Sequence, residues 1–142
     1  MTTTDSPWLG DAVSLVDAFR SKDRSPVEEL QASLAAIERS NLNAFSFLDP
    51  QGALERANLA DVSKPFGGVP LGVKELDAVN GWPYTEACVV FTDRKATYTS
   101  VMVQRATEVG GANPIGLCTA SEFGGVNITR TCLLYTSDAA DE

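Results

Sequence analysis

The chain contains 142 residues, enough for one domain of ordinary size, and its 44% hydrophobic and 21% charged residues are typical of a globular protein. No apolar run is long enough to span a bilayer, and the N-terminus lacks the basic and apolar regions of a signal peptide. A cytoplasmic location without membrane association is therefore expected. The net charge of −8 argues against direct binding of nucleic acid.

The residue types that are missing or sparse narrow the possible chemistry. Histidine is absent, which excludes Ser-His-Asp, Cys-His and imidazole-zinc sites, so a general base must be Asp, Glu, Lys or Tyr, or come from another chain. The cysteines Cys88, Cys118 and Cys132 are odd in number and show no Cys-x-x-Cys spacing. We expect reduced, structural thiols, no metal site and no cofactor.

Helix signals dominate the first sixty residues. Residues 11–21 carry apolar side chains at helical spacing. Ser25 can cap a second helix that runs to about residue 40, because Pro26 suits its first position and Glu28 completes a capping box. Asp49 and Pro50 begin a third helix, which continues to about residue 60.

The pattern then alternates between strands and helices. The remaining predicted elements are a strand at 44–48, a glycine-rich turn leading into a buried strand at 67–76, a turn at 80–83, a helix at 100–109, a strand at 113–117 and a short turn or helical start at 120–124. The helix at 100–109 is expected to present Val101, Met102, Arg105 and Val109 along one side. This alternation predicts an α/β layered fold.

Lys74 is the residue with the strongest indication of chemistry. The other lysines lie in polar, turn-like segments, whereas Lys74 follows Val73 at the end of a glycine-rich apolar strand. Desolvation at such a position turns lysine into a usable base. The alternative is a structural lysine that is paired with Glu75 or Glu122.

Several motifs occur in an order that resembles the amidase signature family. The segment from Gly68 to Leu76, Gly-Val-Pro-Leu-Gly-Val-Lys-Glu-Leu, is similar to that family's Gly-Val-Pro-x-x-x-Lys-Asp motif. The flanking similarities are Leu42 to Phe45, Gly81 to Thr85, Gly111 to Gly116, and Ser121 to Phe123, and the resemblance covers roughly residues 8–131. Leu117-Cys118-Thr119 departs from it, because the family has Lys-Thr-Asn there.

The resemblance implies the fold and the activity. It implies the N-terminal part of an α/β/α sandwich on a mixed sheet, incomplete in this chain, and an amidase that cleaves a small-molecule carboxamide through a Ser-cisSer-Lys triad. Lys74 matches the triad lysine, whose implied role is to hold and deprotonate the bridging serine. The Gly-Gly-Ser-Ser-Gly-Gly segment that carries both serines is absent from the sequence, so the chain alone is expected to be inactive.

The C-terminal residues are expected to be foreign to this domain. Residues 1–131 are interpreted as the N-terminal part of an amidase-signature domain, and residues 132–142 as a non-native tail, because they resemble a translated sequencing adapter. Two other functions remain open: the amidase-type component of a tRNA-dependent amidotransferase, and a non-catalytic binding remnant. The sequence does not specify the amide substrate or the oligomeric state.

Overall fold

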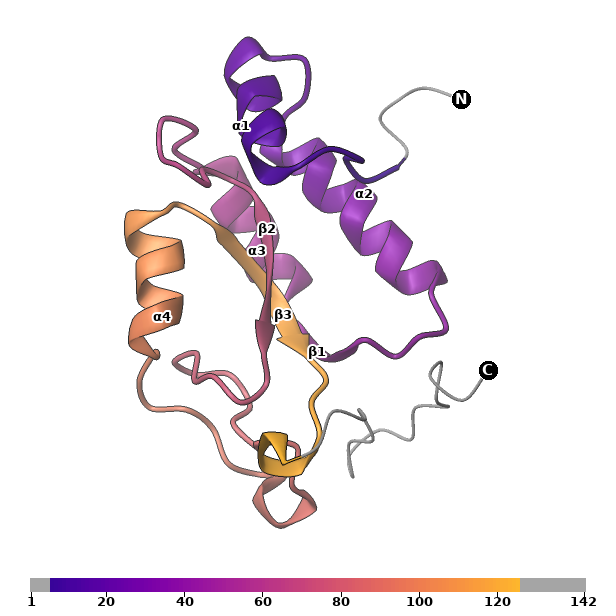
Figure 1. The fold of residues 1–142 in the computed structure, drawn as a ribbon, viewed down its shortest axis with the longest axis vertical. Coiled ribbons are helices and arrows are strands. Elements are labelled where there is room, and N and C mark those ends of the chain that lie inside the picture. Colours follow the sequence, from indigo (N-terminus) through magenta and orange to yellow (C-terminus); the bar gives the residue numbers. More distant parts are fainter. Residues whose placement is uncertain (1–5, 126–142) are drawn as a thin grey trace. The chain divides into compact units, whose positions relative to one another are not determined.

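The computed structural model describes residues 6–125, and the predicted tail at 132–142 lies outside them. The described residues form two compact units (Figure 1). The first contains residues 6–40, 49–71 and 104–115, and the second contains residues 41–48, 72–103 and 116–125. The units are described separately below.

The first unit begins with two capped helices, as the sequence predicts. Helix α1 spans Ala12–Ser21, and the side chain of Asp11 accepts a hydrogen bond from the Ser14 amide at its start. Helix α2 spans Pro26–Arg39, and both hydrogen bonds of the predicted capping box form between Ser25 and Glu28. The caps satisfy amides that the helical hydrogen-bond pattern leaves unpaired.

A third helix completes this helical layer. Helix α3 spans Pro50–Asn58, begins at an Asp49 cap and packs against α2. Small and apolar side chains form the core of the unit: Leu15, Val16, Ala18, Phe19, Leu30, Ala32, Ala53, Ala57 and Ile115 are all at most 6% exposed.

In residues 6–125, three strands form a sheet in the order β1–β3–β2: β1 spans Phe45–Leu48, β2 Pro70–Lys74 and β3 Asn113–Cys118. Strands β1 and β3 are antiparallel, with Phe45 opposite Cys118 and Leu48 opposite Gly116. Beside β2, Asn113 donates to the Val69 carbonyl and Glu75 donates to the Cys118 carbonyl, so β2 and β3 run in the same direction. The predicted α/β fold with a mixed, open sheet is confirmed.

The predicted helix at 100–109 forms, but its second half is wider than an α-helix. Helix α4 spans Val101–Gln104 and continues as a π-helical turn, Arg105–Val109. Because the π turn changes the helical period, the predicted face is wrong: Val103 is buried, whereas Val101, Met102 and Val109 are at least 63% exposed.

The glycine pair after this helix allows a close backbone approach in the first unit. The Gly110 and Gly111 carbonyls accept hydrogen bonds from the amides of Phe66 and Gly68. Gly111 has a φ of +81°, and a Cβ there would lie 2.8 Å from the Lys64 Cβ. Only glycine combines this backbone conformation with this spacing.

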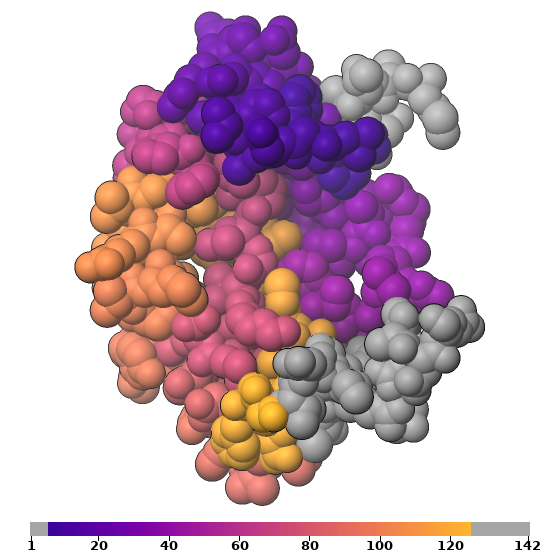
Figure 2. All heavy atoms as spheres, viewed as in Figure 1, coloured from indigo at the N-terminus to yellow at the C-terminus, as the bar shows by residue number. Residues whose placement is uncertain are grey.

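Two short 3₁₀ helices complete the second unit, at Val89–Phe91 and Glu122–Gly124. Residues 122–125 are exposed, and Figure 2 shows this segment at the surface in yellow. Within the described ranges, the structure has no helix long and apolar enough to cross a membrane.

Candidate active site

Lys74 is the last residue of β2, and its ammonium group donates a hydrogen bond to the Thr119 carbonyl, just beyond the end of β3. Among the described residues, this carbonyl replaces the Glu75 or Glu122 carboxylate that the sequence suggested as a partner. The predicted strand is also less buried than expected, because Val73 is buried while Gly72 and Lys74 are exposed. Residues 6–125 therefore orient the Lys74 amine without desolvating it.

Glu75 points away from Lys74 and into the protein. Its side chain belongs to a residue that is 1% exposed, and its Oε1 accepts a hydrogen bond from the Ala120 amide at 2.6 Å. Consecutive side chains of an extended chain point to opposite faces, which explains why these neighbours do not pair with each other.

A small residue in β2 makes room for Cys118. A Cβ at Gly72 would lie 2.6 Å from the Cys118 Sγ and 3.4 Å from the Phe45 ring. Burial raises the pKa of the Cys118 thiol, and the nearby positive charge of Lys74 only partly opposes that effect. Because the thiol form is favoured, Cys118 is suited to packing rather than to nucleophilic attack.

An aromatic cluster around Arg94 fixes the loop that follows Gly81. The Arg94 guanidinium lies 4.5 Å from the centre of the Tyr84 ring and 4.2 Å from that of Phe91, and it forms an ion pair with Glu86. The Glu86 carbonyl accepts a hydrogen bond from the Phe123 amide at 2.9 Å. A hydrogen bond with Tyr98 and burial raise the pKa of Tyr84 to about 12, so the phenol stays protonated at neutral pH.

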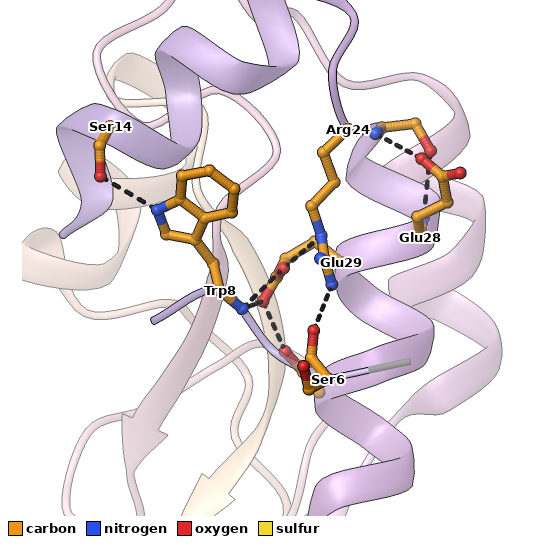
Figure 3. A network of polar contacts seen from close by, with 8 residues as sticks. Ser6, Trp8, Ser14, Arg24, Glu28 and Glu29 are labelled. Atoms are coloured by element: carbon orange, nitrogen blue, oxygen red, sulfur yellow. Dashed lines mark hydrogen bonds and ion pairs between the residues drawn. The ribbon is translucent and has the colours of Figure 1, made fainter. Parts of the chain in front are cut away.

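A separate polar network lies in the first unit (Figure 3). Arg24 and Glu29, whose side chains are each 5% exposed, form an ion pair of 2.7 Å. Arg24 also donates to the Ser6 carbonyl, and the Trp8 amide donates to both Glu29 oxygens. The network fastens residues 6–8 to helix α2, and all four residues serve this structural purpose.

The part of the chain described here contains no group of three or more His, Cys, Asp or Glu side chains that could hold a metal ion. Its chemistry-bearing features are the Lys74 amine and the two residues that surround it, Glu75 and Thr119. Sequence reasoning identified Lys74 but missed the Thr119 carbonyl, because a backbone acceptor leaves no signal in the residue type. It considered Glu75 only as an ion-pair partner, although the alternation of side chains along a strand could have indicated otherwise.

Comparison with known proteins gives a consistent result. The family model described as Amidase matches residues 28–139. The chain is 33% identical over 108 residues to the A-type component of a glutamyl-tRNA(Gln) amidotransferase from Akkermansia muciniphila, which covers 75% of this chain and 23% of the relative. A protein of the same name from Methylocella silvestris is 35% identical over 130 residues, covering 87% and 26%.

Solved structures show the same fold. A 6-aminohexanoate cyclic dimer hydrolase complexed with substrate superposes with a TM-score of 0.82 at 23% identity, over 90% of this chain and 27% of the hydrolase. The chain thus spans about a quarter of the length of the relatives that it matches.

Proposed function

Because the chain belongs to the amidase signature family, we propose that the protein of which it forms a part hydrolyses a small-molecule carboxamide, with Lys74 as its base. The position of the Lys74 amine carries this proposal. Its hydrogen bond to the Thr119 carbonyl holds the nitrogen at the end of β2 in the segment that matches the family's lysine motif.

The geometry suits proton transfer. A neutral lysine amine has two N–H donors and one lone pair. When one N–H is engaged by the Thr119 carbonyl, the lone pair remains free to accept a proton from a serine hydroxyl. In this proposal, a bridging serine passes that proton from the nucleophilic serine, which forms the acyl-enzyme. Both serines belong to the part of the relatives that this chain does not span.

The test uses the whole gene product and a panel of aliphatic, aromatic and cyclic carboxamides, with ammonia or amine release as the measurement. Lys74→Ala should lower kcat/KM by about 10³-fold, in the range expected for loss of a general base. Lys95→Ala is the matched control, because Lys95 is an exposed lysine in the same unit. Hydrolysis that survives Lys74→Ala would contradict the proposed role, and hydrolysis by residues 1–142 alone would contradict the expectation that the chain is inactive.

The name shared by the curated relatives favours a second candidate, the amidase-type component of a tRNA-dependent amidotransferase. That function predicts ammonia release from glutamine only when the other components are present, whereas a stand-alone amidase acts without them. A non-catalytic binding remnant predicts no turnover under either condition. The cytoplasmic location expected from the sequence stays a prediction.

A further inference from the structure

One peptide unit lies between the side chains of Lys74 and Glu75. The Lys74 ammonium group donates to the Thr119 carbonyl, and the Glu75 carboxylate accepts from the Ala120 amide at 2.6 Å. That carbonyl and that amide belong to the same peptide bond. Because a peptide bond is planar and trans, its C=O and N–H point in opposite directions. The two neighbouring side chains, which leave the chain on opposite faces, thus bind the two ends of one rigid group.

The sheet does not supply this contact by itself. The regular pairing of β2 with β3 ends where the Glu75 amide donates to the Cys118 carbonyl at 3.0 Å. On the other side, the Thr119 amide donates to the Ala44 carbonyl at 2.9 Å. This bond fixes the peptide that precedes Thr119, but the peptide that follows can still rotate about the Thr119 ψ angle. The Glu75 carboxylate is the contact that fixes its orientation.

The burial and charge of Glu75 favour a role of this kind. The residue is 1% exposed, and Ala120, whose amide it binds, is also 1% exposed. A carboxylate that accepts from an N–H forms a stronger bond than a neutral acceptor, and it polarises the peptide so that its carbonyl becomes a better acceptor. The contact therefore both orients the Thr119 carbonyl and strengthens the bond that this carbonyl makes with Lys74.

We infer that Glu75 is the positioning residue of the lysine: it fixes the Thr119–Ala120 peptide, whose carbonyl holds the Lys74 amine in place. The inference deepens the amidase function proposed above and rests on it for its catalytic consequence. Its structural part, control of the Ala120 amide by Glu75, holds independently of any activity.

The experiment compares Glu75→Gln, which keeps an acceptor oxygen, with Glu75→Leu, which removes it at similar size. The matched control is Glu122→Leu, which makes the same change at an exposed position. In the ¹⁵N-labelled 142-residue chain, protection of the Ala120 amide from hydrogen exchange should persist in Glu75→Gln and Glu122→Leu and be lost in Glu75→Leu. Protection that persists in Glu75→Leu would overturn the inference.

The kinetic arm uses the whole gene product. Glu75→Leu should lower kcat by about 10²-fold, as expected for a displaced catalytic group, with KM changed less than about twofold. Glu75→Gln should restore most of kcat, and a kcat that is equally low in both variants would overturn the positioning role. If Ala120 protection depends on Glu75 but the parent protein hydrolyses no carboxamide, the proposed function fails while the structural part of the inference stands.

Discussion

At the scale of single residues, the Arg24–Glu29 ion pair should contribute far more to stability than its surface counterpart. Removing one member of a buried pair leaves the other charge desolvated, which costs about 3–5 kcal/mol. Glu29 also accepts from the Trp8 amide and the Ser33 hydroxyl, at 3.2 and 3.1 Å. We expect Glu29→Gln to lower the free energy of unfolding by about 3 kcal/mol, as measured by urea denaturation.

The chain contains a matched control for this prediction. Asp17 pairs with Arg20 at 3.3 Å in helix α1, but these side chains are 65% and 46% exposed. The same carboxylate-to-amide change, Asp17→Asn, should cost at most about 1 kcal/mol, because solvent screens an exposed pair. Equal losses for the two variants would show that burial does not set the strength of the Arg24–Glu29 pair.

At the scale of secondary-structure elements, local signals predicted what local interactions determine. The starts of α1, α2 and α3 follow from Asp11, Ser25 and Asp49, because a capping side chain acts within three residues of its own position. Strands β1 and β3 follow from short apolar runs. In contrast, the π turn and the direction of the Glu75 side chain depend on partners distant in sequence, which residue types alone do not identify.

Lys74 illustrates the same division within the site. The resemblance to a family motif located it, but the strand pattern predicted a buried lysine paired with a carboxylate. The structure instead exposes Lys74 and pairs it with a carbonyl 45 residues away. A position in a strand predicts which face a side chain occupies, whereas its partner depends on which segment lies alongside, here the residues that follow β3.

The turn at Gly110 and Gly111 provides a prediction at the element scale. Gly111→Ala forces a side chain into the left-handed region, at about 1 kcal/mol, and also brings its Cβ to 2.8 Å from Lys64 Cβ and 3.1 Å from Gly67 Cα. We expect a total loss of about 2–4 kcal/mol, because overpacking adds to the backbone strain. Thermal and urea unfolding would measure this loss.

Gly81→Ala separates the two contributions to that loss. Gly81 has a φ of +83°, close to that of Gly111, but no atom lies within 4 Å of a Cβ built there. This variant should therefore lose only the backbone component, about 1 kcal/mol. If both variants lose the same amount, the close approach of residues 64–68 to the glycine pair has no energetic importance.

At the scale of the whole molecule, the chain exposes apolar side chains that a complete protein of this family has more chain to cover. Val89 and Val90 in the second unit are 59% and 79% exposed, and the chain spans about a quarter of the length of its relatives. Exposed apolar surface favours association. We expect the purified 142-residue chain to self-associate as its concentration rises, as measured by light scattering.

Replacing that surface tests its cause. The double variant Val89→Lys/Val90→Lys should reduce the association and change the free energy of unfolding by less than about 1 kcal/mol, because both side chains are exposed. The Asp93→Lys variant is the matched control: it adds the same two units of positive charge at a neighbouring exposed position and leaves the valines in place. If Asp93→Lys suppresses association equally well, net charge is the cause and the apolar surface is not. If only the double variant does so, the valines hold the copies together, and the parent protein should bury them against residues that this chain does not contain.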